Sequence, residues 1–442
     1  MHKLDGDFFR GLVNLEEGTV DRRIFVDEDI YRLELERIFA RTWNFMCHES
    51  QIPETGDYFM NFIGEDSVIV VRDKRGDVQV LLNTCRHRGN SVCRAEMGNV
   101  RSFVCTYHGW TYDLDGRLMG VPGYNTYYNE ELKRENWGLV RAAKVESYKG
   151  FVFATMDPDA PALDDFLGEV GKLGLTTIAA HGDIAVVDGV QKYRMACNWK
   201  LAVDNIYDWY HPPITHVSAL GSGYVSKVPW GPMDHVVSLG EYGHAISGPR
   251  MDREMRASGA KEAASSDCEL REDETWRDRP DAFAQLGEFG AEQRGHPGIF
   301  PNLWVASSGT QLSLRLPRGP ESTEIWWFTL LDKNLSPEER AEAVSRANHF
   351  FGPAGLFEQD DGENWDQGTR ASRGLISKRY PMNFAMNLGH GVIKQHPSGV
   401  AHIDAPLNEH AQLWTYRAWA DWMAARDWAE LKRNHAVPSG VM

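Results

Sequence analysis

Two short groups of potential metal ligands constrain this chain more than any other feature. The first is Cys85-Arg86-His87 and the second is Cys105-Thr106-Tyr107-His108, separated by residues 88–104. Two thiolates and two imidazoles at this spacing can hold an iron–sulfur cluster, with the thiolates on one iron and the imidazoles on the other. A zinc ion with two Cys and two His ligands is the alternative. In either case the sequence predicts a small metal-binding domain with its ligands on two loops.

The residues around these ligands have the pattern of an all-β domain. Short apolar runs such as Ser67–Val71 and Val78–Leu82 are separated by turn residues, here Asp73-Lys74-Arg75-Gly76-Asp77. Runs of this kind, bounded by Gly and Asp, predict short strands joined by tight turns. The chain has 442 residues, more than one hydrophobic core usually supports. We therefore expect an N-terminal helical segment (1–42), the β-domain (43–157) and a larger domain (158–442) on which the N-terminal segment packs.

The remaining residues alternate between signals for helices and for strands. Helices are predicted at Arg22–Thr42, Asn198–Tyr210, Pro337–Phe350 and Ala411–Arg433, and strands at Val236–Tyr242, Gln311–Leu316 and Glu324–Leu331. This mixture indicates an α+β domain with helices over an antiparallel sheet. The acidic stretch Met251–Arg279 lacks periodicity, and we predict a loop there, either mobile above an active site or a simple surface insertion.

Composition disfavours several classes of partner. The formal net charge of −16 argues against nucleic acid, because phosphate binding needs clustered Lys and Arg. No apolar run has the length of a membrane span, and the first residues carry acids where a signal peptide is apolar. We therefore expect a cytoplasmic protein with no membrane partner. In that compartment the six cysteines are expected to be metal ligands or buried thiols, with Cys93 among the thiols.

A second group of potential metal ligands follows later in the chain. His211 and His216 flank the sequence Pro212-Pro213-Ile214-Thr215, and we predict one histidine at a helix end and the other in the next loop. Two imidazoles and one carboxylate form a facial triad on ferrous iron that leaves positions open for O2. Such a histidine pair alone is more often structural. Spacing leaves four acids open as the third ligand: Glu358, Asp360, Asp361 and Glu363.

The first ligand group closely resembles the Rieske [2Fe–2S] motif of aromatic-ring-hydroxylating dioxygenases, in their large (alpha) subunits. The resemblance rests on Cys85-Arg86-His87-Arg88-Gly89 and on Cys105-Thr106-Tyr107-His108-Gly109-Trp110. The segment that ends at His216 is similar to the mononuclear-iron motif of the same family, and residues 351–365 resemble its ligand-bearing helix. The resemblance extends over nearly the whole chain and is strongest to naphthalene, biphenyl and polycyclic-aromatic dioxygenases. It implies a Rieske domain followed by a catalytic domain of the helix-grip (START-like) type.

The resemblance also implies roles for individual residues. Asp208 matches an acid that links the two iron centres across neighbouring subunits, where it accepts a hydrogen bond from the residue at the position of His108. The pair Asp204-Asn205 lies one residue nearer to Asp208 than the matching pair in naphthalene-dioxygenase-like chains and begins with Asp instead of Glu, which leaves the role of Asn205 open. The implied cluster ligands are Cys85, His87, Cys105 and His108; the iron ligands are His211, His216 and Asp361; and the pocket residues are His296, Phe351 and Phe357.

The implied function is that of a terminal oxygenase component. It inserts both atoms of O2 into an aromatic ring to give a cis-dihydrodiol, and electrons pass from a ferredoxin and an NAD(P)H-dependent reductase through the cluster to mononuclear Fe(II). The implied assembly contains a small beta subunit in an α3β3 hexamer. Three alternatives are an alpha-only Rieske monooxygenase or demethylase, a non-catalytic Rieske electron carrier, and a zinc-binding interaction protein. The motifs do not specify which aromatic compound is the substrate.

Overall fold

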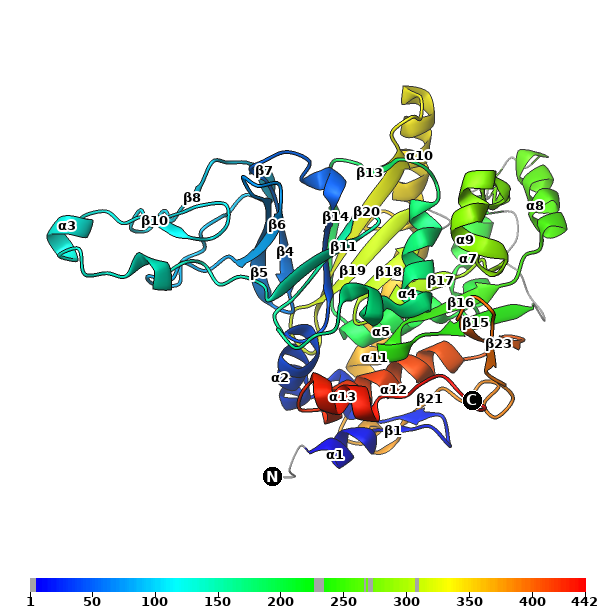
Figure 1. The fold of residues 1–442 in the computed structure, drawn as a ribbon. Helices are drawn as coiled ribbons and strands as arrows, with labels where there is room; N and C mark the ends of the chain where they lie inside the picture. Colours follow the sequence, from blue (N-terminus) through cyan, green and yellow to red (C-terminus); the bar gives the residue numbers. More distant parts are fainter. Residues whose placement is uncertain (1–4, 226–233, 266–267, 269–272, 307–309) are drawn as a thin grey trace. The chain divides into compact units, whose positions relative to one another are not determined.

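The chain divides into two compact units in the computed structural model, which describes residues 5–225, 234–265, 268, 273–306 and 310–442. The small unit is Phe39–Leu163, and the large unit combines Met1–Ile38 with Asp164–Met442. Figure 1 shows the helices and strands of both units. Within the described residues, no helix is long and apolar enough to cross a membrane.

The small unit is built from short antiparallel strands, as the sequence predicted. Its described strands form a four-stranded sheet in the order β6-β5-β4-β7 and two three-stranded sheets, β10-β9-β8 and β11-β12-β3. The strands are β3 (Asn44–His48), β4 (Asp57–Ile63), β5 (Asp66–Arg72), β6 (Val78–Leu82), β7 (Met97–Asn99), β8 (Phe103–Val104), β9 (Thr111–Tyr112), β10 (Leu118–Gly120), β11 (Lys144–Tyr148) and β12 (Phe151–Thr155). Short helical turns lie at η3 (Glu49–Gln51), α3 (Tyr124–Tyr127) and η4 (Arg134–Asn136).

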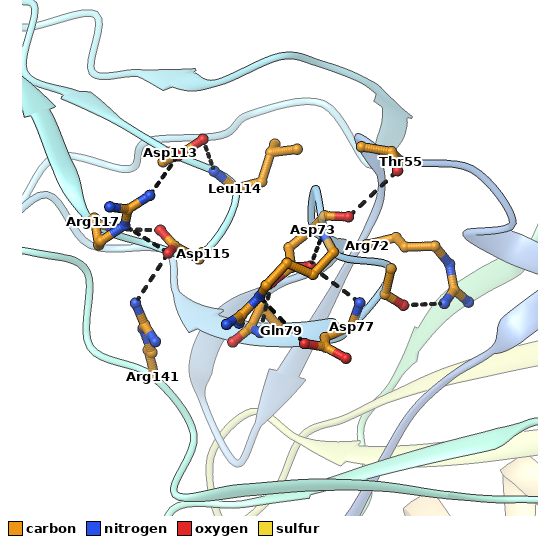
Figure 2. Close-up of polar contacts among 12 residues, drawn as sticks. Thr55, Arg72, Asp73, Asp77, Gln79, Asp113, Leu114, Asp115, Arg117 and Arg141 are labelled. Atoms are coloured by element: carbon orange, nitrogen blue, oxygen red, sulfur yellow. Dashed lines mark hydrogen bonds and ion pairs between the residues drawn. The ribbon is translucent and has the colours of Figure 1, made fainter.

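Aspartate side chains close two hairpin turns of this unit, and Figure 2 shows their contacts. In the turn between β5 and β6, one carboxylate oxygen of Asp73 accepts hydrogen bonds from the backbone N–H groups of Arg75 (2.8 Å) and Asp77 (3.1 Å). In the turn between β9 and β10, Asp113 accepts from the N–H of Leu114 (2.9 Å) and pairs with Arg117 (3.1 Å). Asp is favoured in turns because its short side chain can bond to the nearby backbone in this way. The turn predicted at 73–77 is therefore confirmed.

The large unit contains one antiparallel sheet of ten described strands, which confirms the α+β prediction. The order is β13-β20-β19-β18-β17-β16-β15-β23-β22, with β14 also paired to β20. The strands are β13 (Ile184–Val186), β14 (Gln191–Met195), β15 (His235–Leu239), β16 (Ala245–Pro249), β17 (His296–Ile299), β18 (Leu303–Ala306), β19 (Gln311–Pro317), β20 (Thr323–Asp332), β22 (Lys394–Gln395) and β23 (Ala401–Ala405). A separate small sheet joins β1 (Val13–Asn14), β2 (Thr19–Val20) and β21 (Met382–Asn383).

The helices of the large unit agree with the predictions in part. They are α1 (Gly6–Arg10), α2 (Glu28–Glu34), α4 (Leu163–Ala179), α5 (Trp199–Asp204), α6 (Pro212–Thr215), α7 (Val217–Gly221), α8 (Arg253–Ser265), α9 (Pro280–Glu292), α10 (Pro337–Phe350), α11 (Leu356–Ser372), α12 (His410–Ala424) and α13 (Trp428–Asn434). Shorter 3-10 helices are η1 (Arg22–Phe25), η5 (Asn205–Tyr207), η6 (Glu241–Gly243), η7 (Thr275–Asp278) and η9 (Ser377–Arg379), and η2 (Leu35–Phe39) is a short π-helix.

Several predictions about these elements are wrong. The helix expected at Ala411–Arg433 is divided into α12 and α13 by residues 425–427. The single helix expected at Arg22–Thr42 is broken after η1, because the carboxylate of Asp27 caps a new helix, α2, by accepting from the N–H groups of Asp29 and Ile30. The loop expected at Met251–Arg279 contains the thirteen-residue helix α8 and the turn η7; residues 266–267 and 269–272 lie outside the described part. Helix α8 has few buried residues, so its sequence lacks the apolar stripe by which helices are predicted.

A buried ion pair ties the N-terminal segment to the rest of the large unit. Glu34 and Lys200 are almost fully buried, and their charged atoms lie 2.5 Å apart. The same carboxylate accepts the indole N–H groups of Trp199 (2.9 Å) and Trp419 (2.7 Å). Both carboxylate oxygens of Glu34 thus accept hydrogen bonds from donors elsewhere in the chain, as a buried charge requires. Helix α2 is thereby fixed to α5 and α12, and α5 leads directly to the histidines of the site.

Different helices pack on the two faces of the main sheet. Residues paired directly across antiparallel strands point to the same face. One such row runs through Gly298, Trp304, Ser313 and Trp327, whereas Pro297 and Ile299 point to the opposite face. Helix α4 covers the Pro297 side, because a side chain on Gly174 would touch Pro297 and Ile299. A side chain on Gly298 would instead collide with the hydroxyl of Tyr207, so η5 lies on the Gly298 side. We call this second side the site face.

Candidate functional site

The four predicted cluster ligands lie on two loops of the small unit that have the same backbone design. In each loop the cysteine N–H donates to the carbonyl five residues later: Cys85 to Asn90 (2.9 Å) and Cys105 to Trp110 (2.8 Å). In each loop the N–H of a glycine four residues after the cysteine donates a hydrogen bond of 2.9 Å to the cysteine carbonyl. These are Gly89 and Gly109, with φ angles of 72° and 71° that a side chain would disfavour. The glycines therefore turn both loops back on themselves.

The side chains of the two loops converge. Cys85 and Cys105 are buried, and the Cys85 sulfur lies 3.2 Å from the hydroxyl of Tyr112. The rings of His87 and His108 lie 4.5 Å apart at 70°, and the indole of Trp110 stacks on His87 at 5.0 Å. The Nδ1 atom of His87 is buried without a hydrogen-bond partner in the described part of the chain. An orphaned imidazole nitrogen beside two buried thiols fits the donor set of a Rieske cluster.

Other cysteines take no part in this site. All six are free thiols, so no disulfide is formed. The prediction of a buried thiol at Cys93 is wrong, because this residue is only partly buried and its sulfur lies 3.5 Å from the carbonyl of Ala95. Its neighbour in space, Asn83, accepts the Cys93 N–H at 2.8 Å and so fixes the loop between the two ligand groups.

The second ligand group converges more tightly. The Nε2 atoms of His211 and His216 lie 3.2 Å apart, and one carboxylate oxygen of Asp361, Oδ1, lies 3.2 Å from the first and 3.4 Å from the second. His216 and Asp361 are buried, and Asp361 Oδ1 has no hydrogen-bond partner within the described residues. Among those residues this is the one group of three side chains close enough to share a metal ion. Two imidazole nitrogens and one carboxylate oxygen are the donors of a facial triad.

Local backbone structure positions the two histidines differently from the prediction. The helix expected at Asn198–Tyr210 ends at Tyr207, and Asp208 has extended backbone angles. His211 caps the start of α6, a single helical turn, and His216 caps its end. Proline is favoured at the first position of a helix, where its missing N–H costs nothing. Pro212 therefore starts α6 instead of ending an earlier helix, and the turn brings both imidazoles to one side.

Helix α11 brings Asp361 to the histidines across a long sequence separation. It contacts α5 and α7, which flank the histidine segment. A side chain at Gly362 would lie 2.3 Å from the Met195 methyl group on β14, so this glycine permits a close approach of α11 to the sheet. Trp365, one turn after Asp361, is 5% exposed. The site face of the sheet, α11 and the α6 turn thus enclose the triad.

Two further carboxylates lie behind the histidines. The outer nitrogen of His211, Nδ1, is 3.4 Å from Asp208 Oδ2, and that of His216 is 3.6 Å from Asp360 Oδ2. Asp208 also accepts the backbone N–H of Tyr210 (2.7 Å), and Asp360 accepts the hydroxyl of Ser218 (2.7 Å). Acceptors behind a metal-binding histidine fix its tautomer and the direction of its inner nitrogen. Asp360, one of the four acids left open as the third iron ligand, thus lies behind His216 and outside the group of three converging donors.

The carboxylates also set the protonation of the histidines. Burial disfavours the charged form of His211, but Asp208 and Asp361 outweigh burial and raise the pKa of His211 to about 10. Burial lowers the pKa of His216, and Asp361 only partly opposes this effect. Burial raises the pKa of Asp208, but hydrogen bonds and charge from His211 more than compensate, so the net shift of that pKa is downward. Metal ligands bind in their deprotonated forms, so metal binding at this triad competes with protons.

Aromatic rings connect the triad to the sheet. Phe357 lies 4.5 Å from His216 and 6.4 Å from Phe351, which in turn lies 4.7 Å from Trp304. His296 lies 5.1 Å from the same tryptophan, so the structure brings the three expected pocket residues into one connected group. Burial lowers the pKa of His296 to about 3, which keeps its imidazole neutral.

The side chain of Asn205 makes no contact comparable to those of His296, Phe351 and Phe357. Asn205 begins η5, and its carbonyl accepts the N–H of Asp208 at 3.2 Å. The described residues offer its side-chain amide no hydrogen bond. Its neighbour Asp204 is half-buried and accepts a hydrogen bond from the hydroxyl of Tyr416; desolvation is the main reason that the pKa of Asp204 lies well above its ordinary value. The sequence carried no signal for this pair, because Tyr416 lies more than two hundred positions later.

Comparison with known proteins identifies both units. Residues 42–148 match the model of the Rieske [2Fe–2S] domain, and residues 183–425 match that of the ring hydroxylating alpha subunit (catalytic domain). The alpha subunit of biphenyl 2,3-dioxygenase from Rhodococcus jostii is 36% identical, over 97% of this chain and 94% of its own. The alpha subunit of benzene 1,2-dioxygenase from Pseudomonas putida is 32% identical, over 95% and 94%.

A solved structure of naphthalene 1,2-dioxygenase with indole in its active site has the same fold. It matches with a TM-score of 0.84 and 27% identity, over 96% of each chain. A Rieske domain and a ring-hydroxylating catalytic domain in one chain imply one [2Fe–2S] cluster and one mononuclear iron. The chain therefore belongs to the alpha subunits of the aromatic-ring-hydroxylating dioxygenases, the terminal oxygenase components that oxidise aromatic rings with O2.

Proposed function

We propose that the two ligand groups hold the two metal centres of this dioxygenase. Cys85, His87, Cys105 and His108 would bind the cluster in the small unit; His211, His216 and Asp361 would bind Fe(II) in the large unit. The observation that carries the second assignment is the approach of three donor atoms to within 3.4 Å of one another, with no other partner for Asp361 Oδ1. Glu358 and Glu363 do not join this group of donors.

When bound, the cluster supplies electrons and the ferrous iron binds and activates O2. The protein's own side chains orient and enclose these groups. Asp208 and Asp360 would hold the imidazoles with Nε2 inward. His296, Phe351 and Phe357 would form the wall against which the aromatic ring lies, because neutral, mostly apolar side chains suit such a ligand. The neutral imidazole of His296 can still form one hydrogen bond with a bound product.

The partners follow from the same family membership. We propose a head-to-tail trimer of this chain, joined by three small beta subunits, in which Asp208 of one chain accepts a hydrogen bond from His108 of its neighbour. The Asp208 side chain is 32% exposed, so it remains accessible to such a donor. The relatives are named as subunits, which supports a multi-component enzyme. A ferredoxin and an NAD(P)H-dependent reductase would supply electrons in the cytoplasm.

Isotope labelling tests this function. The purified oxygenase, supplied with a ferredoxin and its reductase, is given biphenyl or benzene under labelled O2. We expect a cis-dihydrodiol in which both hydroxyl oxygens carry the label. A single labelled oxygen, or loss of an N-methyl group from an N-methylated substrate in place of ring oxidation, would support a monooxygenase or demethylase instead. The variant Asp361→Ala is the control, because it should abolish product while the cluster remains.

A further inference from the structure

Two adjoining hollows on the small unit form what we call the basic groove. Their volumes are about 470 Å³ and about 740 Å³, and the smaller one contains residues of both aspartate-closed turns. Arg117 and Arg141 line both hollows, and Figure 2 shows their side chains on the carboxylate of Asp115, at 2.7 Å and 3.7 Å. The groove is lined by six cations, Lys74, Arg75, Arg86, Arg117, Arg134 and Arg141, and by four acids, Asp73, Asp113, Asp115 and Glu135.

The charge of this groove is opposite to that of the chain. The chain has a formal net charge of −16, but its small unit, residues 39–163, contains 14 Lys and Arg against 16 Asp and Glu and so carries only −2 of that charge. Six cations and four acids give the groove itself a charge of +2. An acidic protein would therefore be repelled by the large unit and attracted to the groove.

Two arginines of the larger hollow are held in place without being neutralised. Arg86 and Arg134 are exposed, and Nη1 of each donates to a backbone carbonyl, that of Gly138 at 3.3 Å and that of Met119 at 2.8 Å respectively. The guanidinium of Arg134 also lies over the ring of Tyr124, 4.7 Å from its centre. No carboxylate of the described residues forms an ion pair with either arginine. Both charges are thus oriented before any partner arrives, which reduces the entropy lost on binding.

Apolar side chains lie among these charges. Met119 lines the larger hollow and is 43% exposed. Trp137 and Val140 are exposed to a similar extent, and each lies between lining residues in the sequence. Arginine, methionine and aromatic residues are enriched at protein interfaces relative to the rest of the surface. The composition of the groove is therefore that of a protein-docking surface.

The groove adjoins the first cluster-ligand loop. Arg86 directly follows Cys85, and its backbone N–H donates at 3.1 Å to the hydroxyl of Tyr112, which lies 3.2 Å from the Cys85 sulfur. Leu118 and Leu139 line the larger hollow and belong to the apolar core that also contains the two ligand cysteines. A protein seated in the groove would thus be close to the proposed cluster.

The second ligand loop stays outside the groove. None of residues 105–110 lines either hollow. His108, which we propose contacts Asp208 of a neighbouring chain, is therefore not covered when the groove is filled. This separation allows a partner to bind and leave while the neighbouring chain keeps its place.

We infer that the basic groove is the docking surface for a small acidic electron-transfer protein, whose carboxylates contact Arg86 and Arg134. One electron passes from the reduced [2Fe–2S] group of that protein to the oxidised cluster, and no bond forms or breaks. This inference rests on the proposed function, since it assumes a cluster at the four proposed ligands. It goes further in naming the surface at which electrons enter and in separating that surface from His108, through which they leave.

The rate of cluster reduction tests the inference. The complete oxygenase, with both metal centres loaded, is mixed without oxygen with a reduced, acidic plant-type [2Fe–2S] ferredoxin, whose potential is low enough to reduce a Rieske cluster. In the wild type, the second-order rate constant should fall about 10-fold or more between roughly 0.02 M and 0.5 M salt. At low salt, Arg134→Glu should lower that rate constant about 5-fold to 20-fold, and Arg134→Gln should lower it less.

Two controls separate docking from other effects. Arg101→Glu makes the same change of charge in the same unit, but Arg101 is exposed and lines neither hollow, so its rate constant should fall less than about 2-fold. Photoreduced deazariboflavin is an uncharged reductant, and it should reduce the cluster of Arg134→Glu as fast as that of the wild type.

Four results would overturn the inference. A wild-type rate constant that does not respond to salt is one, and it needs no variant. Equal slowing by Arg134→Glu and Arg101→Glu is the second, and equal slowing of the deazariboflavin reaction in Arg134→Glu is the third. Dissociation of the oxygenase assembly in Arg134→Glu, seen by size-exclusion chromatography, is the fourth, because it would assign the groove to a neighbouring subunit. The Rieske-type resonance signal and the iron content report separately on the proposed function.

Discussion

The carboxylate behind His216 gives a quantitative prediction for Asp360→Asn. Asp360 Oδ2 lies 3.6 Å from the outer nitrogen of His216, which is buried. Mutation of an acceptor behind a metal-binding histidine typically weakens metal binding by about 10-fold to 100-fold, and Asn removes the negative charge while it keeps one amide oxygen. The contact is longer than an ordinary hydrogen bond, so we expect the lower end, about 10-fold, or roughly 1.4 kcal/mol.

The assay is the retention of iron against a chelator, followed in parallel with the spectrum of the reduced cluster. In Asp360→Asn the mononuclear iron should dissociate at about ten times lower chelator concentration, and the cluster spectrum should not change. Ser218→Ala is the matched control, because it removes only the hydroxyl that donates to Asp360 at 2.7 Å and keeps the carboxylate. Unchanged iron retention in Asp360→Asn would refute the idea that this carboxylate orients His216. Equal losses in both variants would assign the effect to the local hydrogen bond instead.

Three other perturbations have defined outcomes. Glu34→Gln should lower the free energy of unfolding in urea by about 3–5 kcal/mol, since it leaves Lys200 buried without an anion; a loss below about 1 kcal/mol would contradict this. Burial lowers the pKa of His244 to about 4, so its contribution to stability is complete above the ordinary pKa of 6.5 and is lost as the pH falls from 6.5 to about 4. At pH 5 the shifted pKa of His244 alone should lower the free energy of unfolding by roughly 2 kcal/mol. In His244→Gln the free energy of unfolding should therefore fall less between pH 7 and pH 5. Asp208→Asn should also weaken iron binding, because its carboxylate lies 3.4 Å from His211; when both metal centres are fully loaded, it should still block electron transfer between them, and normal product formation in a single turnover would contradict the linking role.

Local sequence signals were sufficient where the stabilising interactions are local. Helix α10 begins and ends where its pattern indicates, because Ser336 and Glu339 cap each other's backbone N–H groups and proline occupies the first turn. The same local logic fails at α8, whose exposed, polar sequence lacks an apolar stripe. It fails again at α6, where a proline that can end one helix can equally begin another.

In the candidate site, too, residues that are close in sequence were predictable, and contacts between residues distant in sequence were not. The ligand motifs Cys85–His87, Cys105–His108 and His211–His216 are visible in the sequence because their members lie within a few residues of one another. Which acid of α11 faces which histidine depends on the packing of that helix, and neighbouring acids, Asp360 and Asp361, contact different atoms of His216. The ion pair between Arg315 and Glu358 could not be predicted, because the two residues meet only when β19 and α11 pack together.

The most direct test of the ligand assignments is electron paramagnetic resonance of the dithionite-reduced protein, with iron and acid-labile sulfide measured on the same samples of wild type and Asp361→Ala. The wild type should show a Rieske-type signal with about three irons and two sulfides per chain, and the variant should keep the signal and the sulfides but contain about two irons. A variant that retains the third iron would move the carboxylate ligand to another acid. A wild type with no such signal and with zinc in its place would contradict both metal centres.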